Sequence, residues 1–238
     1  MNIAIIGYGR MGHEVEAMAL NRGHVVRLII DQNNKEDLNG KNLKGIDAAL
    51  EFSIPDTAFN NIVKCLGLKI PVVSGTTGWL SDYEKAVEVC RINNSSFLHS
   101  TNFSIGVNIL FRLNIELARY MSRLMEYSPS IEEIHHTGKI DAPSGTAITL
   151  AGGITVNNPK YKGWSPENDK TENLISVRSI RTGSVPGTHI ITWDSEVDSI
   201  ILRHEARSRK GLALGAVVAA EFIHDKKGVF TMNDVLGF

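Results

Sequence analysis

Residues 3–12 read Ile-Ala-Ile-Ile-Gly-Tyr-Gly-Arg-Met-Gly, a short apolar run that leads directly into a glycine-rich loop. Such a run is typical of a strand buried on both faces of a parallel sheet. Apolar residues then recur at helical spacing up to Gly23, and a second strand is expected over residues 24–30, ending at Asp31. The G-x-G-x-x-G pattern thus lies between a strand and a helix, and an acid follows about nineteen residues after its last glycine, which predicts a dinucleotide-binding fold.

Each glycine of this loop has its own role in such a fold. Gly7 permits the tight turn, Gly9 lets the backbone approach a pyrophosphate, and Gly12 allows close packing of the helix on the strand. The pyrophosphate is expected at the helix N-terminus, where N–H groups and the helix dipole favour an anion. The glycines alone are also typical of a simple turn, so it is the flanking strand, helix and acid that favour a cofactor site.

The acid at the end of the second strand bears on which cofactor binds. Asp31 is expected to accept hydrogen bonds from the adenosine ribose hydroxyls, and its charge repels a 2′-phosphate. Gln32 follows it where an arginine would bind that phosphate, which favours NADH over NADPH. Lys35 is close enough in sequence to weaken this preference.

Further strands are expected over residues 47–52, 69–74 and 96–100, with helices over 56–66 and 81–91. This alternation predicts a parallel sheet, whose ligands bind at the carboxyl ends of the strands. The loops that follow these strands are rich in glycine, serine, threonine and asparagine, which are small donors for ribose and for a nicotinamide amide. Together they predict the rim of a cofactor site.

The pattern changes after Gly106. One long amphipathic helix is expected over residues 107–125, then a strand over 130–135 and a long loop over 157–171. Further strands are expected over 174–182, 189–195 and 199–206. Their alternation suggests antiparallel pairing. The predicted fold is therefore α/β, with a Rossmann-type dinucleotide-binding domain and an inserted α+β domain whose sheet is mostly antiparallel.

The bulk composition excludes several classes of protein. The 238 residues carry a formal net charge of −1, so no overall basic field recruits nucleic acid or anionic lipid. Cys65 and Cys90 stand in no metal-ligand spacing and are expected to be reduced and buried. Neither a signal peptide nor a run of about eighteen apolar residues is found, so we expect a cytoplasmic protein with no nucleic-acid or membrane partner.

The most informative stretch is residues 132–147, Glu-Glu-Ile-His-His-Thr-Gly-Lys-Ile-Asp-Ala-Pro-Ser-Gly-Thr-Ala. It places two imidazoles and an ammonium group at a strand end, before a turn and a new helix. Either Asp141 or Ser144 can cap that helix, and Pro143 suits its first turn. The backbone N–H groups of Gly145 and Thr146 would then form a seat for a carboxylate.

Lys139 and His136 add positive charge to this seat, and His135 and Lys139 can give up protons. With a hydride donor on the other domain, the chemistry is reduction of a C=C or C=N bond in a small anionic compound. One histidine on a strand is usually structural, and a histidine pair can also bind metal. Neighbouring residues of a strand point to opposite faces and no third ligand has zinc-like spacing, so no metal is expected.

Residues 132–147 match, without a gap, the pattern E-x-x-H-H-x-x-K-x-D-A-P-S-G-T-A, and in this the chain resembles the dihydrodipicolinate reductase family. The resemblance extends along nearly the whole chain. It includes residues 9–12, Phe52-Ser53, 75–78, 102–104, Arg181-x-Gly183, Pro186-Gly187-x-His189, Ser208-Arg209 and 230–236.

The resemblance implies roles for individual residues. His135 is implied to be the catalytic acid or base, and Lys139 a second proton donor. The substrate is implied to bind His136, Ser144, Gly145 and Thr146. The implied cofactor contacts are Gly7, Tyr8, Gly9, Arg10, Met11, Gly12, Asp31, Phe52, Ser53, Gly75, Thr76, Thr77, Ser100, Thr101, Asn102, Phe103 and Arg209.

The family reduces 4-hydroxy-tetrahydrodipicolinate, a small dicarboxylate, to tetrahydrodipicolinate with NADH or NADPH in the diaminopimelate pathway of lysine biosynthesis, and it works as a homotetramer. The resemblance implies a dinucleotide-binding domain over residues 1–104 and 210–238, and a substrate-binding and tetramerisation domain over 105–209. Family members often have a longer first loop, and basic residues where this chain has Gln32 and Ile54. Those two differences again favour NADH.

Two other hypotheses are open. Another two-domain nicotinamide-dependent amino-acid or diamine dehydrogenase would share the nucleotide half, but it needs no His-His-x-x-Lys before Pro-Ser-Gly-Thr. An NAD-sensing regulatory protein would be expected to have lost His135, His136 or Lys139, and all three are present.

Overall fold

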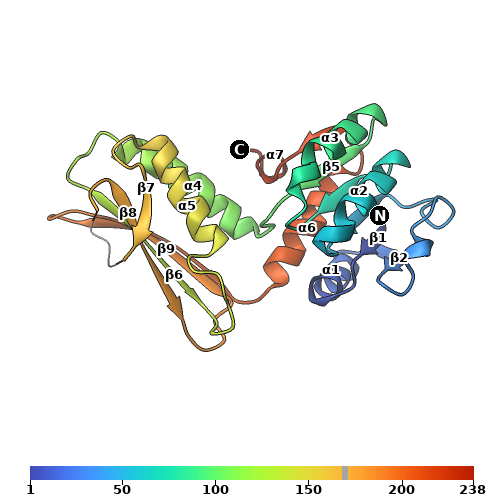
Figure 1. Ribbon diagram of the computed structural model, residues 1–238, viewed down its shortest axis with the longest axis horizontal. Coiled ribbons are helices and arrows are strands. Elements are labelled where there is room, and N and C mark those ends of the chain that lie inside the picture. The colour runs from blue at the N-terminus through green and yellow to red at the C-terminus, as the bar shows by residue number, and fades with distance from the viewer. Residues whose placement is uncertain (168–170) are drawn as a thin grey trace. The chain divides into compact units, whose positions relative to one another are not determined.

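The computed structural model describes residues 1–167 and 171–238, which fold into two compact units. The first unit contains residues 1–105 and 209–238, and the second contains residues 106–208. Each has its own sheet, helices and apolar core (Figure 1). The expected α/β class, with a Rossmann-like parallel sheet and a second domain, is confirmed.

The first unit is built on a six-stranded sheet in which all neighbouring strands are parallel, as the alternation of strands and helices predicted. Its order is β11 (Gly228–Phe230), β5 (Ser96–His99), β4 (Val72–Ser74), β3 (Ala48–Glu51), β1 (Asn2–Ile6) and β2 (Val25–Ile30). The chain forms β2 on one side of β1 and then returns to form β3 on the other. The sequence did not predict the edge strand β11, which is only three residues long.

Two long helices cover each face of this sheet. The helices α1 (Arg10–Asn21) and α6 (Lys210–Ile223) share one face, and α2 (Pro55–Gly67) and α3 (Tyr83–Ile92) share the other (Figure 1). Short elements complete the unit, namely two 3₁₀ turns, Lys35–Asp37 and Leu80–Asp82, and the helix α7 (Met232–Leu236).

The first strand shows why the run at residues 3–6 is continuously apolar. Ile3 and Ile5 pack in the core that includes α1 and α6, whereas Ala4 and Ile6 pack in the core that includes α2 and α3. Since successive side chains of a strand point to opposite faces, a strand covered on both sides has no position for a polar residue.

The glycine-rich loop depends on close backbone contacts. A Cβ atom on Gly7 would lie 2.2 Å from the carbonyl oxygen of Phe52, and the φ angle of Gly7 is +92°, which other residues rarely adopt. A Cβ atom on Gly12 would lie 2.4 Å from the carbonyl oxygen of Gly7. A side chain on Gly7 would therefore displace the loop after β3, and one on Gly12 would push α1 away from the end of β1.

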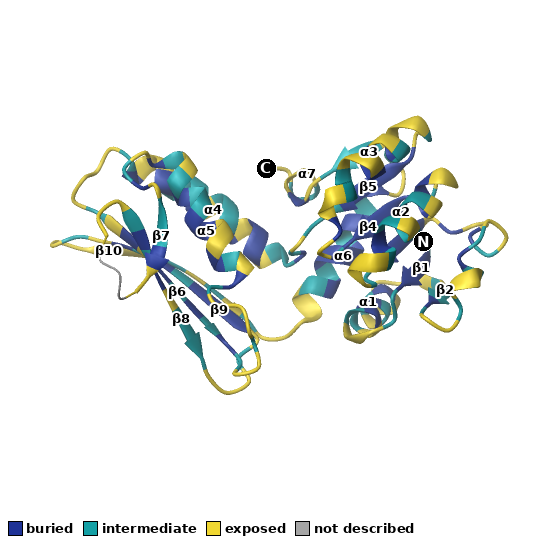
Figure 2. Cartoon of the chain, viewed as in Figure 1, coloured by how far each residue is buried: buried dark blue, intermediate teal, exposed yellow. Residues whose placement is uncertain are grey.

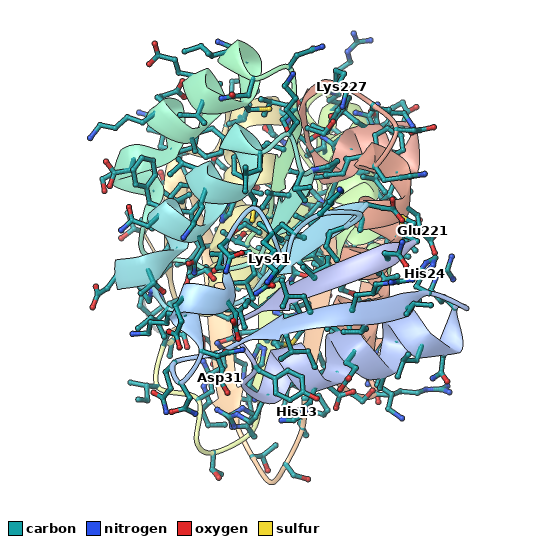
Figure 3. All side chains as sticks on the ribbon, turned by 90° about the vertical axis from the view of Figure 1, so that its right-hand side faces the viewer. His13, His24, Asp31, Lys41, Glu221 and Lys227 are labelled. Carbon is teal, nitrogen blue, oxygen red and sulfur yellow. The ribbon has the colours of Figure 1, made fainter. Side chains whose placement is uncertain are left out.

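An ion pair on the surface holds the turn between α1 and β2 against α6. The carboxylate of Glu221 lies 2.7 Å from the guanidinium of Arg22 and 2.7 Å from Nε2 of His24 (Figure 3). These contacts link residues that are far apart in sequence, and they join α6, in the C-terminal part of the first unit, to the N-terminal part.

The second unit has a mixed five-stranded sheet. Its order is β10 (Ser199–Ala206), β9 (Gly187–Asp194), β6 (Ser128–His135), β8 (Leu174–Arg181) and β7 (Gly163–Pro166). The expected antiparallel pairing joins β9 to both of its neighbours, while β8 pairs in parallel with β6 and β7. The parallel pairing of β6 with β8 is possible because a helix, α5 (Gly145–Asn157), lies between these two strands in the chain.

The core of this unit lies between one face of the sheet and the helices α4 (Ile105–Met121) and α5. It includes Ile131, Ile191 and Trp193 from the sheet and Leu150 from α5. The edge strand β10 has exposed or half-buried residues throughout, including Ile200 and Ile201 (Figure 2). The long helix expected over 107–125 begins two residues earlier and ends at Met121.

The expectation of a loop throughout residues 157–171 is wrong in part, because β7 lies within it. Trp164 packs against the core and Ser165 is buried, whereas Pro166 ends the strand. Proline is tolerated in a strand only at an edge, and this is an edge strand. Residues 168–170 of the predicted loop lie outside the described residues.

We expect Gly215→Ala to destabilise the protein. A Cβ atom on Gly215 of α6 would lie 1.7 Å from the carbonyl oxygen of Phe103, so the backbone must move. We expect the free energy of unfolding to fall by about 2 kcal/mol, measured by urea denaturation. Gly211→Ala in the same helix is the control, since its nearest neighbouring atom lies 3.9 Å away. Equal losses in the two variants would contradict this account.

Candidate active site

A pocket of about 420 Å³ lies at the carboxyl ends of β1, β2 and β3 in the first unit. This is the point where the strand order reverses, at which doubly wound sheets bind their ligands. The pocket is lined by Ile6, Gly7, Tyr8, Gly9, Ile30, Asp31, Gln32, Lys35, Phe52, Ser53, Ile54, Thr57 and Asn61.

The structure brings part of the predicted cofactor set to this pocket. The predicted residues that line it are Gly7, Tyr8, Gly9, Asp31, Phe52 and Ser53. Arg10, Met11 and Gly12 form the first turn of α1, directly after the glycine loop. Thr57 and Asn61 of α2 also line the pocket, and the sequence did not point to them because helix positions facing a pocket leave no distinctive pattern.

The shape of the glycine loop fits a dinucleotide. No atom lies within 4 Å of the position that a Cβ on Gly9 would take, so a ligand can approach the backbone there. Gly9 is also the N-cap of α1 and has no side chain to cover the helix end. At the opposite rim, Oδ1 of Asp31 accepts a hydrogen bond of 2.6 Å from the backbone N–H of Asn33, which fixes the orientation of the carboxylate.

A buried carboxylate holds two of the predicted cofactor loops together. Glu51, the last residue of β3, is fully buried. It accepts hydrogen bonds from Oγ of Ser74 at 2.7 Å, from Oγ1 of Thr76 at 3.0 Å, and from both the backbone N–H and the hydroxyl of Ser53. The loops after β3 and β4 are therefore joined through one side chain that the sequence analysis did not single out.

The loops after β4 and β5 meet around one aromatic ring. A Cβ on Gly75 would lie 2.1 Å from the ring of Phe52, and the rings of Phe52 and Phe103 are 5.8 Å apart. Ser100 donates a hydrogen bond from its backbone N–H to Ser74, so the loop that holds Ser100, Thr101 and Asn102 lies beside the loop after β4. Of the other predicted contacts, Thr77 is exposed and Arg209 is the exposed N-cap of α6.

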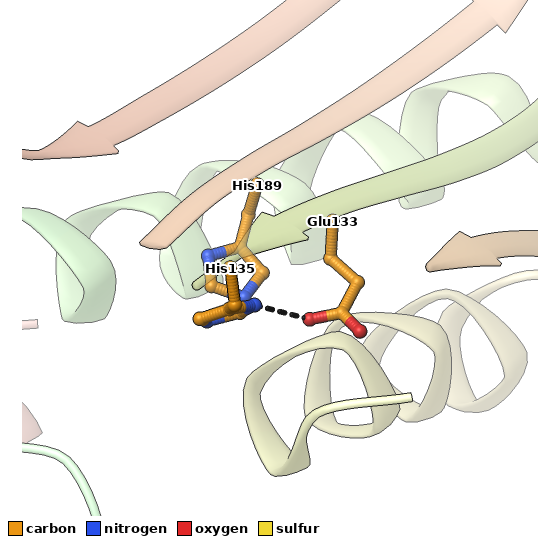
Figure 4. Close-up of side chains that lie close together, drawn as sticks. All are labelled: Glu133, His135 and His189. Carbon is orange, nitrogen blue, oxygen red and sulfur yellow. Dashed lines mark ion pairs between the residues drawn. The ribbon is translucent and has the colours of Figure 1, made fainter. Parts of the chain in front are cut away.

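The second unit gathers charged groups at the end of β6. His135 is 8% exposed, and its Nδ1 lies 2.6 Å from Oε2 of Glu133, which is fully buried (Figure 4). The other oxygen of Glu133 accepts hydrogen bonds from the guanidinium of Arg181 at 2.7 Å and from the backbone N–H of Ser144 at 3.2 Å. Burial would raise the pKa of Glu133, but the hydrogen bonds from His135, Arg181 and Ser144 hold this pKa well below its usual range.

A second imidazole lies beside the first. His189 of β9 meets His135 edge-on, with the ring centroids 5.1 Å apart (Figure 4). Its Nε2 lies 3.2 Å from Oγ of Ser144. Burial lowers the pKa of His189 to about 4, and the neighbouring His135 contributes to this shift, so His189 is neutral at neutral pH.

The predicted carboxylate seat is the N-terminus of α5. Ser144 is the N-cap and its Oγ accepts a hydrogen bond from the backbone N–H of Ala147, so Gly145 and Thr146 form the first turn. Pro143 was expected in the first turn of this helix, but it lies one residue before the cap. Lys139, in the loop before the helix, lies 2.7 Å from Asp141, and its side chain is 23% exposed. His136, the next residue after His135, is half-buried.

Glu133, His135 and His189 are the types of residue that bind metal ions, and their ligand atoms lie within 4.8 Å of one another. Their surroundings oppose a divalent cation, because the carboxylate of Glu133 already pairs with the guanidinium of Arg181. Oxygen or imidazole ligands of a metal normally have neutral or anionic neighbours. That no metal binds here stays a prediction.

Sequence reasoning missed Glu133, and it quoted Arg181 and His189 without giving them roles. A usable signal was present for Glu133, because side chains two apart on a strand share a face. This places Glu133 beside His135 and Glu132 on the opposite face, as the structure shows. No such local pattern exists for Arg181 and His189, which come from the strands on either side of β6.

Two family descriptions match the chain. "Dihydrodipicolinate reductase, N-terminus" matches residues 1–103, and "Dihydrodipicolinate reductase, C-terminus" matches residues 106–236. The chain belongs to the dihydrodipicolinate reductase family. As a member of this family it is an oxidoreductase that uses a nicotinamide cofactor.

Relatives of known name cover the whole length of this reductase. The 4-hydroxy-tetrahydrodipicolinate reductase of Christiangramia forsetii is 51% identical over 237 residues, covering 99% of this chain and 98% of the relative. That of Thermosipho africanus is 32% identical, with coverage of 99% and 98%. The solved dipicolinate-bound dihydrodipicolinate reductase of Paenisporosarcina has the same fold, with a TM-score of 0.81 at 23% identity over 97% of each chain.

None of the helices within residues 1–167 and 171–238 is long and apolar enough to cross a membrane.

We expect acid to destabilise the fold through His189. The unfolded chain binds a proton near the ordinary pKa of 6.5, whereas folded His189 does so only near pH 4. The stabilising contribution is thus complete above pH 6.5 and is lost as the pH falls from 6.5 to about 4, by about 3 kcal/mol. Urea denaturation of wild type and His189→Gln at several pH values measures it.

His224→Gln, which removes an exposed histidine, is the control for that experiment. The acid-induced loss of stability should be smaller in His189→Gln than in wild type, and unchanged in His224→Gln. An equal loss in all three proteins would contradict the assignment.

Proposed function

We propose that the chain reduces 4-hydroxy-tetrahydrodipicolinate to tetrahydrodipicolinate, with loss of water, in the diaminopimelate pathway of lysine biosynthesis. The observation that carries the proposal is the clustering of His135, Lys139 and the N-terminus of α5 after β6. This combination provides two proton donors next to an anion seat. The names of the relatives that are 51% and 32% identical support the same substrate.

In this proposal the residues of the second unit divide by role. His135 is the catalytic acid or base, and Lys139 is a second proton donor. His136, Ser144 and the backbone N–H groups of Gly145 and Thr146 hold the substrate carboxylates. A dicarboxylate is the favoured class of substrate because two anionic groups match the cationic side chains and the helix N-terminus. The dipicolinate bound to the Paenisporosarcina relative is consistent with this class.

The reaction replaces a hydroxyl group by hydrogen, so the substrate gains a hydride and the hydroxyl leaves as water with one proton. A bound nicotinamide supplies the hydride. The proton comes from the chain, either from Nζ of Lys139 or from the imidazole of His135. His135 is the last residue of β6, so the sheet fixes its backbone position before the substrate arrives, and Lys139 lies in the loop that follows.

We infer that residues 1–104 and 210–238 bind the dinucleotide and that residues 105–209 bind the substrate and form the oligomer. Gly7, Tyr8 and Gly9 would hold the pyrophosphate, and Asp31 the adenosine ribose. The loops of Phe52-Ser53, Gly75 to Thr77 and Ser100 to Phe103 would hold the nicotinamide half, and Arg209 is an outlying contact.

A homotetramer is proposed from the surface of the second sheet. The strand β10 is an edge strand, and its Ile200 and Ile201 are 40% and 58% exposed. These two side chains point to opposite faces of an edge strand, and an exposed edge with apolar residues favours contact with another chain. The cytoplasmic location expected from the sequence stays a prediction.

The direct test mixes the protein with freshly made product of dihydrodipicolinate synthase and follows the absorbance of NADH or NADPH. We expect the cofactor to be oxidised. His135→Ala and Lys139→Ala should each lower kcat by about 10²- to 10⁴-fold, because each removes a proton donor, while the KM for the cofactor stays nearly unchanged.

Lys162→Ala is the control, since Lys162 is an exposed lysine of the same unit. No oxidation with either cofactor would reject the proposed reaction. Reduction of NAD+ or NADP+ on addition of diaminopimelate or another amino acid would instead favour the dehydrogenase alternative.

Cofactor preference is a separate part of the proposal, in which NADH is used in preference to NADPH. Gln32 and Lys35 line the pocket next to Asp31. We expect Gln32→Arg to raise kcat/KM for NADPH relative to NADH by about ten-fold, because a charge-assisted hydrogen bond to the 2′-phosphate is gained. Asn33→Arg adds the same charge outside the pocket lining and should change the ratio much less. An unchanged ratio in Gln32→Arg would show that this part of the pocket does not select the cofactor.

A further inference from the structure

We propose that Glu133, held in place by Arg181, is the positioning residue for His135. It fixes the imidazole with Nδ1–H toward the carboxylate. Nε2 is then the nitrogen that exchanges a proton with the substrate. This inference rests on the proposed function, in which His135 is the acid or base. It adds to that function the atom that acts and the two residues that select it.

The geometry of β6 carries the first step. Glu133 and His135 lie two residues apart on the same face of the strand, with Oε2 and Nδ1 separated by 2.6 Å. An unprotonated ring nitrogen and a carboxylate oxygen would repel each other at this distance, so we assign the proton to Nδ1. In the neutral imidazole this leaves Nε2 unprotonated, and in the imidazolium it leaves Nε2–H as the proton that can be given away.

Arg181 carries the second step. Its guanidinium lies 2.7 Å from Oε1 of Glu133, and the backbone N–H of Ser144 donates to the same oxygen. Glu133 is fully buried, so these donors take the place of water and keep the carboxylate charged and in one orientation. Arg181 also donates to the carbonyl oxygens of Lys139 and Asp141, and it thereby ties the orientation of His135 to the loop that holds Lys139.

The surroundings of Nε2 carry the third step. A Cβ atom on Gly187 would lie 3.0 Å from Nε2 of His135, so a side chain at this position would press against that nitrogen. Glu133 from β6 and His189 from β9 contact the ring of His135. The other charged groups near it are Arg181 of β8, which pairs with Glu133, and the Lys139–Asp141 pair of the following loop. His189 is neutral at neutral pH, so it does not oppose the charge of a protonated His135.

The chain offers a matched pair of acids for the test. Glu132 is the neighbour of Glu133 but points to the other face, where its side chain is 29% exposed and lies 3.4 Å from Arg178. Glu132 and Glu133 thus both pair with arginines of β8, yet only Glu133 contacts the imidazole of His135. Glu133→Gln and Glu132→Gln therefore remove the same charge from the same strand on opposite faces.

We expect Glu133→Gln to lower kcat by about ten- to hundred-fold and to move the pH profile of kcat, while the Kd for NADH stays unchanged. Glu132→Gln should leave both the rate and the profile as in wild type. A purely structural Glu133 would lower the melting temperature without moving the pH profile. Wild-type kcat and pH profile in a folded Glu133→Gln variant would overturn the proposal.

The tautomer is measured on the wild-type protein by ¹⁵N NMR of its histidine side chains, with the His135 signals assigned by their loss in His135→Gln. The neutral ring of His135 should be the Nδ1–H tautomer, and Glu133→Gln should reduce its share. An Nε2–H tautomer in wild type would overturn the proposal even if Glu133→Gln does not fold. If the protein fails the reductase assay but shows the Nδ1–H tautomer, the proposed reaction is rejected while the positioning of the ring stands.

Discussion

A carboxylate buried away from water keeps its charge only where hydrogen-bond donors replace the solvent, and Glu133 meets this condition with donors from three elements. His135 comes from the same strand, Arg181 from the end of β8, and the N–H of Ser144 from the N-cap of α5. These contacts fix the relative positions of the two strands and of the helix start. The imidazole and the anion seat of the second unit therefore depend on one ionised side chain.

The first unit also has a buried, hydrogen-bonded acid at the end of a strand. Glu51 is fully buried and accepts hydrogen bonds from Ser53, Ser74 and Thr76. The donors to Glu51 are hydroxyl and N–H groups of loops. The side chains that contact Glu133, in contrast, are those of an arginine and a histidine. Glu51 thus orients loops that are suited to bind a ligand through small donors, whereas Glu133 orients groups that carry charge and protons. In both units, an acid at the end of a buried strand determines where the adjacent loops lie.

The sequence predicted those parts of the molecule whose cause is local. The apolar run at residues 3–6 and the glycines after it act on their immediate neighbours, so their positions could be inferred from spacing. The helix cap was narrowed to Asp141 or Ser144, and the structure has Ser144. The strands β7 and β11 were missed because they are edge strands of four and three residues, and pairing with a neighbouring strand stabilises them more than their own residues do. Arg181 could not be assigned a role for the same reason, since its partner Glu133 lies 48 positions away along the chain.

Strand alternation determines which face of β6 His135 occupies. His135 shares a face with Glu133, while His136 follows on the other side of the strand end and is half-buried. The charges of Glu133 and Arg181 cancel, and His189 is neutral at neutral pH, so the net charge of this buried group is that of His135 itself. In the proposed function, an anionic substrate held at the start of α5 would lie near this group, where a positive charge and an anion attract each other strongly because little water screens them. A bound dicarboxylate and a positive charge on this imidazole would therefore stabilise each other, which a neutral substrate could not achieve.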